Sequence, residues 1–587
     1  MLTLRHAGRA AGLLLLPTIA FAQGARRAPA SGAASAAGGG ELPLKHAPRP
    51  TTPAITAGDL MTRLYVFADD SMLGREVGTL GNYKATEYLA AEAKRIGLVP
   101  AGEGGTYFQT LPLVTRSFAE LSLAAGDAPL TAWTDYAPLP PLPFLPSGNP
   151  RPLRGVQVVY GGVLGDSSRL LTAEQAKGKL VVLEVPTEAD GSRTFQFWQY
   201  GIPEALLGAA GLAVVALDVF PTPFVDYLRV PQTEVRRGAE PEGLRGEAPR
   251  ILLVTPRAAN ILLGANLAGM RPGTPGRTIA GDVTSRETPS PYPARNVVAV
   301  LPGSDPALRG EYVALGAHSD HDGIRSGGAV DHDSVRAFNG VARPGGAETP
   351  DGPVGAAQME RIRALADSLR RRHGARADSI YNGADDDGSG SVAALEIAEA
   401  LASATSRPRR SILFVWHTGE EKGMYGSEWF TDHPTVPRDS IVAQLNMDMI
   451  GRGSPADVPN GGGPGYLQLI GSRRLSTELG DLVERVNADG RHGFVFDYSM
   501  DANGHPQQYY CRSDHYEYAR YGIPIVFFTT GGHRDYHEVT DEPQYMDYEK
   551  MARVARFVGD VALRVANLDH RVVVDHPKPD PEGTCVQ

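Results

Sequence analysis

The chain has 587 residues, of which 42% are hydrophobic and 21% are charged, and its formal net charge is -10. This composition excludes a disordered or fibrous protein, and the length is sufficient for two or more hydrophobic cores. No basic run occurs, and no stretch alternates basic with aromatic residues. The electrostatic pattern that binds phosphate backbones is therefore missing, which predicts that nucleic acid is not a partner.

The first residues have the pattern of a secretory signal peptide. Arg5 and Arg9 precede an apolar run that ends in an Ala-Phe-Ala cleavage sequence. Because the run is too short for a permanent membrane span, we expect residues 1–22 to be removed near Ala22 and the protein to be secreted or periplasmic, without a stable membrane anchor. An uncleaved anchor is the alternative. Residues 23–55, rich in Ala, Gly, Pro and Ser, predict a flexible linker.

Cysteine is rare in this chain. Cys511 and Cys585 are the only two cysteines, which excludes a disulfide-rich scaffold and a cysteine-rich zinc site. In an oxidising compartment they either form one bridge or remain two free thiols, and the sequence leaves both alternatives open.

A proline-rich segment at 136–152 marks a domain boundary. Beyond it, four short β-type runs (VQVVYGG, KLVVLEVP, LAVVALDV and RILLVTP) and one helix-like segment (PEALLGAAG) predict a small α/β module without clustered acids, bases or nucleophiles. The predicted order is a leading helical part of the main domain (56–135), the inserted module (136–290), the main domain (291–570) and a C-terminal tail (571–587).

From Asn296 onward, apolar strand-like runs alternate with helical segments. This alternation predicts an α/β fold with a mostly parallel mixed sheet flanked by helices. Ligands in such folds gather at the carboxyl ends of the strands. The predicted strands are NVVAVL, YVALGAH, SILFVWH, IVAQLNMDMI, YLQLIG and GIPIVFF, and the predicted helices cover 391–404, 422–432, 475–487 and 547–566.

Polar motifs follow four of these strands, and a fifth motif, NGADDDGSG at 382–390, opens a helix. Each motif alone is explained as a surface histidine, a solvated helix start or a helix cap. Their coincidence at consecutive strand ends instead favours one joint site. The candidate residues after the strands are His318 and Asp320, Glu420 and Glu421, Asp448, and His537.

Imidazole and carboxylate ligands without cysteine are typical of a site for two Zn²⁺ ions per chain. One carboxylate has to bridge the pair. With Asp386 as the bridge, His318 and Asp448 complete one ion, and Glu421 and His537 complete the other, with a shared water between the two metals.

Two further carboxylates complete the predicted chemistry. Asp320, two residues beyond His318, is positioned to accept the free ring N–H of that histidine without binding the metal itself. Glu420 is predicted to act as general base and then general acid, because the attacking water has to lose a proton and the leaving amine has to gain one.

The chain resembles the exported di-zinc aminopeptidases, whose fold also underlies glutamate carboxypeptidases, the transferrin receptor and glutaminyl cyclases. The inserted module resembles a protease-associated domain. The resemblance spans about 320–540, with the leading helical segment as a further match. The matching strings are GAHSDHDG (316–323), NGADDDGSG, HTGEEKGMYGSEWF (417–430), NMDMIG (446–451), CRSDHYEY (511–518) and YHEVTDE (536–542).

The resemblance implies the same five metal ligands, with Asp386 bridging, and it implies Glu420 as the general acid/base. It further implies Tyr536 as an oxyanion donor and Arg512 as a substrate contact. Asp385 and Asp387 remain alternatives for the bridge. The neighbouring residues expected to lie around the ligands or on the surface are His321, Asp322, His332, Asp514 and His515.

One departure from the family pattern is an insert at about 324–380, which is expected to rim or cover the site. The predicted function is a zinc exopeptidase acting on peptides, as an aminopeptidase. The alternatives are a carboxypeptidase or dipeptidase, a cyclising acyltransferase with a single zinc, and a non-catalytic receptor on the same scaffold. The sequence does not predict an oligomeric state.

Overall fold

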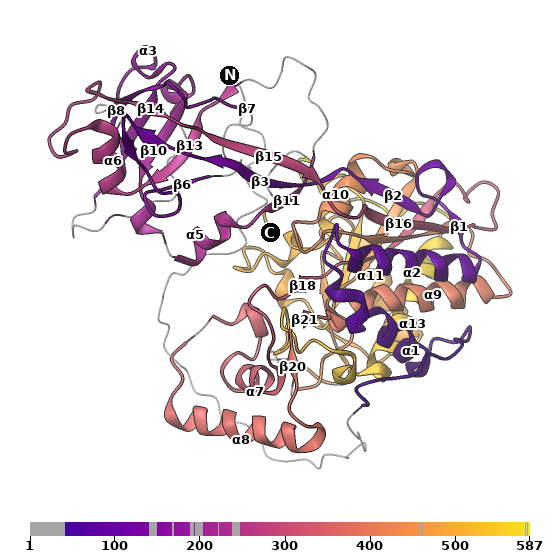
Figure 1. Cartoon of the computed structure of the whole chain (residues 1–587). Helices are drawn as coiled ribbons and strands as arrows, with labels where there is room; N and C mark the ends of the chain where they lie inside the picture. Colours follow the sequence, from indigo (N-terminus) through magenta and orange to yellow (C-terminus); the bar gives the residue numbers. More distant parts are fainter. Residues whose placement is uncertain are drawn as a thin grey trace. The chain divides into compact units, whose positions relative to one another are not determined.

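The computed structural model describes residues 42–587 except 140–148, 167–169, 188–192, 194–202, 221, 237–246, 351, 456, 459–461, 582 and 584. The expected signal peptide and most of the expected linker lie outside this range. The chain forms two compact units (Figure 1): unit 1 contains Pro112–Pro289, and unit 2 contains residues 42–111 and Ser290–Gln587. None of the helices in the described part of the chain combines the length and the hydropathy needed to cross a bilayer.

Unit 1 begins earlier than the expected 136, because a long antiparallel pair precedes the proline-rich segment. The first of these strands, β3 (Leu113–Leu121), pairs with the last strand of the unit, β15 (Val283–Pro289). Residues 112–135, which we expected in the main domain, therefore belong to unit 1. A third strand, β11 (Gln232–Val235), pairs with the other edge of β3.

The larger sheet of unit 1 has the order β5-β4-β14-β8-β9-β10-β13-β6, and β8, β9, β10 and β13 are parallel. Alternate residues of these four strands enter two separate apolar clusters, as the period of two requires. The bounds are β4 (Ala124–Ala125), β5 (Ala128–Pro129), β6 (Tyr136–Pro138), β8 (Gln157–Val163), β9 (Leu180–Glu184), β10 (Gly211–Val215), β13 (Arg250–Val254), β14 (Pro275–Ala280), α3 (Ala173–Ala176), α5 (Thr222–Arg229) and α6 (Pro256–Leu263).

The segment PEALLGAAG, predicted as a helix, forms a single 3₁₀ turn over Glu204–Leu206. The chain then enters β10 at Gly211, which pairs in parallel with both β9 and β13. The helix-like composition thus yields only one turn, because the paired strand begins directly at the end of the segment.

Unit 2 contains the predicted α/β domain, and the predicted fold class is confirmed. Its nine-stranded mixed sheet has the order β1-β16-β22-β17-β23-β26-β24-β25, with β2 also paired to β16, and its central strands β22, β17, β23 and β26 are parallel. The bounds are β1 (Val99–Pro100), β2 (Phe108–Leu111), β16 (Ala294–Leu301), β17 (Tyr312–His318), β22 (Ser411–His417), β23 (Ile441–Met447), β24 (Tyr466–Ile470), β25 (Val495–Asp497) and β26 (Ile525–Thr529).

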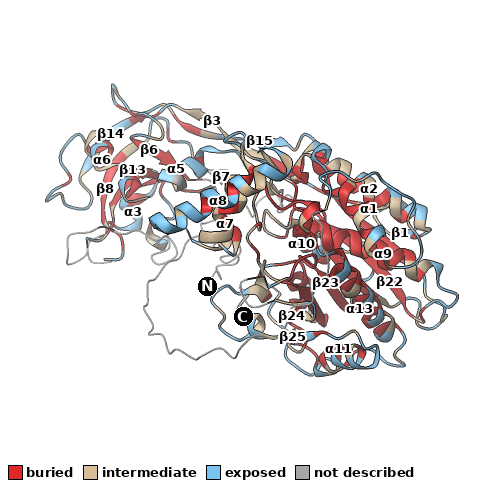
Figure 2. Ribbon diagram, turned by 90° about the horizontal axis from the view of Figure 1, so that it is seen from below, coloured by how far each residue is buried: buried red, intermediate tan, exposed pale blue. Residues whose placement is uncertain are grey.

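Both faces of this sheet are covered by helices, so the central strands are buried throughout (Figure 2). On one face, alternate strand residues join a cluster with residues of α1, α2, α9, α11 and α13, and on the other they join residues of α10 and α12. The bounds are α1 (Ala57–Phe67), α2 (Leu80–Ile96), α9 (Gly390–Ser403), α10 (Tyr425–Asp432), α11 (Thr477–Asp489), α12 (His515–Ala519) and α13 (Tyr548–Ala566).

The insert leaves and rejoins the main domain through two short antiparallel pairs. The pairs are β18 (Gly323–Ile324) with β21 (Ile380–Tyr381), and β19 (Val330–Asp331) with β20 (Ala377–Asp378). Between them lie α7 (His332–Ala342), the 3₁₀ turn η6 (Gly346–Glu348) and α8 (Ala356–His373). The two helices pack through a small apolar cluster that contains Ala337, Ile362 and Ala366.

Candidate metal centre

The predicted polar motifs meet at the carboxyl ends of the four parallel strands of unit 2. His318 is the last residue of β17, and Asp448 directly follows β23. Glu420 and Glu421 lie in the turn after β22, and His537 lies in the loop after β26. Asp386 lies in the irregular turn Ala384–Ser389 that leads into α9.

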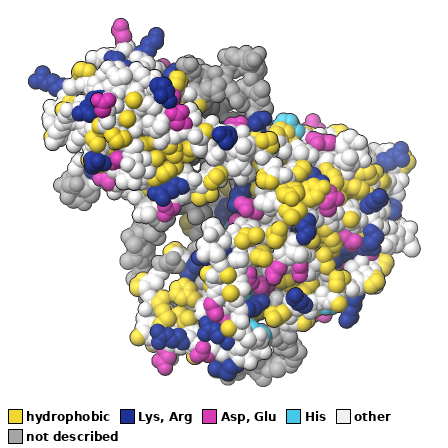
Figure 3. Space-filling view, viewed as in Figure 1, with side chains coloured by type: hydrophobic (Ala, Val, Ile, Leu, Met, Phe, Trp, Pro, Cys, Tyr) yellow, Lys and Arg dark blue, Asp and Glu magenta, His cyan; other side chains and the backbone are white. Residues whose placement is uncertain are grey.

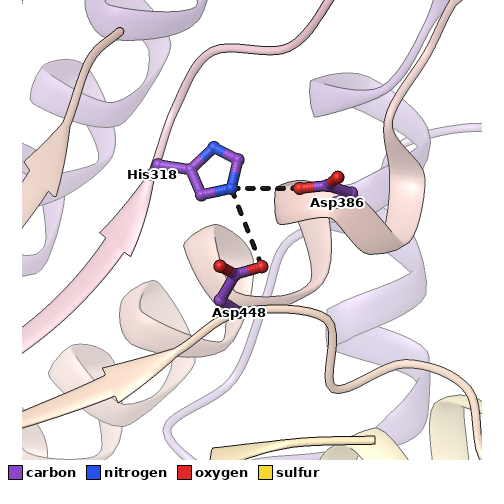
Figure 4. A group of neighbouring side chains, drawn as sticks. All are labelled: His318, Asp386 and Asp448. Carbon is purple, nitrogen blue, oxygen red and sulfur yellow. Dashed lines mark ion pairs between the residues drawn. The ribbon is translucent and has the colours of Figure 1, made fainter. Parts of the chain in front are cut away.

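A first group consists of His318, Asp386 and Asp448, all of which are buried. Figure 4 shows Nε2 of the histidine directed at both carboxylates, at 3.0 Å from Oδ1 of Asp386 and 3.7 Å from Oδ1 of Asp448. This Nε2 makes no hydrogen bond. A buried imidazole nitrogen facing two carboxylates fits a divalent cation among the three side chains.

A second group forms around His537. Its Nε2 lies 3.1 Å from Oδ2 of Asp386 and 3.2 Å from Oε2 of Glu421. Its Nδ1 lies 3.1 Å from Oδ2 of Asp322, a carboxylate that can fix the ring tautomer. The two oxygens of Asp386 thus face two different histidines, one in each group.

The three consecutive aspartates have different partners, which separates the alternatives that the sequence left open. Asp387 accepts the backbone N–H groups of His318 (3.0 Å), Gly390 (2.9 Å) and Met449 (3.3 Å). Asp385 accepts the N–H of Gly451 at 2.6 Å, and its other oxygen lies 3.1 Å from Nε2 of His533. The carboxylates on either side therefore hold the backbone, and the middle one is directed at the two histidines.

Electrostatics keeps Asp386 ionised, which is the form that a metal ligand needs. Burial alone raises the pKa of this carboxyl group, but its contacts with His318 and His537 outweigh burial and leave the pKa well below its usual range. In a metal-bound site, the cations would supply the positive charge that the histidines supply here.

Asp320 has a different role from the expected one. Its Oδ1 lies 3.8 Å from Nδ1 of His318, whereas its backbone oxygen lies 3.2 Å from that nitrogen. Its carboxylate instead accepts the N–H groups of Glu420 (3.1 Å) and Glu421 (3.4 Å). Asp320 thus positions the Glu-Glu turn, because the strand end brings its main chain rather than its side chain to the histidine.

Glu420 is partly buried beside the first group. Burial raises the pKa of this carboxyl group well above its usual value, and the nearby Glu421 and Asp448 raise it further, although His318 opposes them. Bound cations would oppose the shift in the same way. A carboxyl group that can exchange a proton therefore lies next to the candidate ligands.

Tyr536 and Arg512 lie next to each other at the edge of the site. A guanidinium nitrogen of Arg512 donates to the Tyr536 hydroxyl at 3.4 Å. The Tyr536 ring lies beside that of His537, with 4.2 Å between centroids. Burial raises the pKa of Tyr536, so the hydroxyl remains a proton donor.

His321 lies closer to the candidate ligands than the sequence indicated. Its Nδ1 is 2.5 Å from Oε1 of Glu421 and 4.0 Å from Oδ2 of Asp386. The sequence led us to expect it around the ligands or on the surface. The repeated acid and histidine pattern of HSDHDG was the signal for a second histidine. His332, Asp514 and His515 are buried in unit 2 and belong to neither of the two groups.

The donor set fits zinc. It combines imidazole with carboxylate, and the two cysteines are joined in a Cys511–Cys585 disulfide and are not available as ligands. The disulfide also decides between the two alternatives for these residues that the sequence left open.

Residues 363–562 match the sequence profile of peptidase family M28. Leupeptin-inactivating enzyme 1 of Streptomyces exfoliatus is 39% identical over 174 residues, 29% of this chain and 34% of the relative. Leucine aminopeptidase 1 of Aspergillus niger is 28% identical over 197 residues, 31% of this chain and 46% of the relative. The chain thus spans about a third to a half of the length of these relatives.

Among solved structures, an aminopeptidase from Aneurinibacillus sp. strain AM-1 aligns with 89% of this chain and 97% of its own, at 16% identity and a TM-score of 0.42. A zinc aminopeptidase from Bacillus subtilis aligns with 87% and 95%, at 14% identity and a TM-score of 0.42. The profile match covers Asp386, Glu420, Glu421, Asp448 and His537. Through residues 363–562, the chain is similar to peptidase family M28.

Proposed function

We propose that the protein is a zinc-dependent exopeptidase that removes amino-terminal residues from peptides. One observation carries this proposal: the two oxygens of Asp386 face His318 and His537 at 3.0 and 3.1 Å. A carboxylate with one histidine on each oxygen is suited to bridge two divalent cations.

The proposed ligand sets are His318 and Asp448 for one Zn²⁺, and Glu421 and His537 for the other, with Asp386 shared. When bound, the ions would polarise the scissile carbonyl and lower the pKa of the attacking water. The buried, unbonded Nε2 of His318 supports a cation at the first group.

Glu420 is the proposed general base and acid. Its carboxylate takes the proton of the attacking water and returns it to the leaving amine. The raised pKa of Glu420 supports this role, because a less acidic carboxyl group holds a transferred proton more readily. Asp320 holds the backbone of Glu420 and thereby limits its motion.

The carboxylates around the metal groups would also hold the ammonium group of a peptide. The protonated Tyr536 hydroxyl is a proposed donor to the oxygen of the scissile carbonyl. The names of the two curated relatives, a leucine aminopeptidase and a leupeptin-inactivating enzyme, support a peptide substrate. A carboxypeptidase or dipeptidase is the second candidate, because Arg512 lies beside Tyr536 and could bind a terminal carboxylate.

We further propose that the protein works outside the cytoplasm after cleavage near Ala22. The disulfide between Cys511 and Cys585 supports this, because such bonds persist in oxidising compartments. Unit 1 is proposed as a protease-associated-like module with a role in substrate selection.

The test combines metal analysis with peptide hydrolysis. The purified protein is expected to contain about two zinc ions per chain and to release free amino acids from the amino end of short peptides. Glu420→Gln is expected to retain zinc and lose activity, because it removes the base and leaves the ligands intact. Glu549→Gln, an exposed residue in the first turn of α13, is the matched control.

Each alternative has its own outcome. Release from the carboxyl end would favour the carboxypeptidase or dipeptidase. A zinc-loaded protein that hydrolyses no peptide in the panel would contradict the proposal and favour a non-catalytic scaffold.

A further inference from the structure

The insert at 324–380 contributes a turn, η6, that packs against the loop containing His537. The N–H of Ala347, in η6, donates to the Tyr536 backbone oxygen at 3.0 Å. Gly346 has a φ of 57°, and a Cβ there would lie 2.6 Å from that same oxygen. Only glycine therefore allows this approach. A further ion pair of 3.0 Å, from Arg343 to Glu538, ties the same two segments together.

This fit fixes the position of Glu348, the last residue of η6. Its Oε1 lies 2.6 Å from a guanidinium nitrogen of Arg512, and its Oε2 accepts the hydroxyl hydrogen of Tyr509 at 3.0 Å. Both carboxylate oxygens are thus engaged by residues from the main domain. The side chain of Glu348 is 19% exposed and that of Arg512 is 36% exposed, so the pair faces solvent in part.

Arg512 lies at the edge of the site, next to residues that contact both candidate metal groups. Its other terminal nitrogen reaches the Tyr536 hydroxyl, next to His537. The following residue, Ser513, donates to Oδ2 of Asp448 at 2.8 Å. The guanidinium is therefore near residues of both groups, within reach of a short peptide bound there, and one of its nitrogens is already paired with Glu348.

We propose that Glu348 is a specificity-determining residue: it neutralises Arg512 and thereby prevents the site from recruiting the terminal carboxylate of very short peptides. This inference rests on the proposed aminopeptidase function and names its preferred substrates as peptides whose carboxylate lies away from the site. A guanidinium free of Glu348 would bind a carboxylate through two parallel N–H donors. The insert thus supplies the charge that separates aminopeptidase from dipeptidase behaviour.

The test compares two substrates that differ only in one charge, leucyl-alanine and leucyl-alaninamide. The measured quantity is the ratio of their kcat/KM values. Glu348→Gln keeps the shape of the side chain and removes its charge. We expect this variant to raise the ratio in favour of leucyl-alanine by about threefold to fivefold, through KM, which is the size expected for a partly exposed ion pair.

Two further variants complete the experiment. Glu360→Gln removes the same charge from an exposed position of α8 in the same insert, and its ratio should equal that of the unmodified protein. Figure 3 shows acidic and basic side chains mixed over this part of the surface. In the double variant Glu348→Gln with Arg512→Leu, the gain for leucyl-alanine should disappear, because the two effects act through one guanidinium.

An unchanged ratio in Glu348→Gln would overturn the inference, as would an equal loss on both substrates, which is the signature of a structural role alone. A gain that persists in the double variant would also overturn it. These results leave leucine release by the unmodified protein intact. Absence of release from both substrates would instead contradict the proposed function, and the inference would fall with it.

Discussion

The sheets of units 1 and 2 have the same arrangement at their centres, with four parallel, buried strands. In unit 1 the polar groups at the strand ends are engaged locally: Glu184 accepts a hydrogen bond from Tyr160, and Thr255 caps α6. In unit 2 the corresponding positions carry His318 and Asp448, which converge with Asp386. Two similar sheets therefore differ in the side chains that follow their strands, and those side chains decide which sheet has a site.

The cores of the two units are also separate. Among the described residues, each of the four large apolar clusters draws its members from one unit only. The two sheets are therefore expected to fold and to respond to mutation as independent cores.

The largest expected effect tests the difference between the strand ends. Asp386→Asn should lower kcat/KM by about a thousandfold or more and reduce the bound zinc, because one amide oxygen cannot replace a bridging carboxylate. Glu184→Gln is the same kind of change at a strand end of unit 1. It should leave kcat/KM and the bound zinc unchanged. The two variants are compared by their zinc content and their rate of peptide hydrolysis. Equal losses in both would contradict the assignment of the site to unit 2 alone.

A second prediction tests the independence of the cores. Leu252, fully buried in β13, contributes to the core of unit 1. Leu252→Ala should destabilise that unit by about 2–5 kcal/mol through lost burial and a residual cavity. Calorimetry should show one transition shifted to lower temperature and the other unchanged. A shift of both transitions would show that the cores are coupled.

The disulfide permits the converse test in unit 2. Cys585→Ser opens a bridge that spans 74 residues of sequence, and should destabilise unit 2 by about 2–4 kcal/mol because the unfolded chain gains freedom. In this variant, the thermal unfolding transition of unit 1 should remain at the same temperature. Loss of stability in unit 1 would contradict the assignment of the tail to unit 2.

The smallest effect is expected from removing unit 1 as a whole. Leu111 and Ala294 are antiparallel partners on β2 and β16, so the two ends of the insertion lie side by side. Replacement of 112–290 by a short Gly-Ser linker should therefore preserve the sheet and about two zinc ions per chain. Metal analysis and circular dichroism provide the measurement, and an unfolded or metal-free product would show that the sheet of unit 2 depends on unit 1.

Much of unit 2 was predictable because its strands are continuous apolar runs with helices between them. The runs YVALGAH and SILFVWH coincide with β17 and β22. The candidate site was predictable for the same reason: parallel strands place their carboxyl ends at one edge.

Other features depended on contacts between distant segments. The PEALLGAAG segment has helical composition, but it forms one 3₁₀ turn and leads directly into β10, which is paired on both sides by distant strands. The start of unit 1 was missed because β3 pairs with β15, more than 160 residues away. The contact of Glu348 with Arg512 likewise joins the insert to a distant loop, and no local sequence pattern predicts it.

The aspartates on either side of Asp386 have a practical consequence for experiments with metal chelators. Because Asp385 and Asp387 are held by four backbone N–H groups from three segments, we expect the backbone around the site to keep its shape without bound cations. Dialysis against a chelator should consequently yield a folded protein that can be reloaded. Cobalt or manganese could then be introduced as spectroscopic substitutes without refolding the chain.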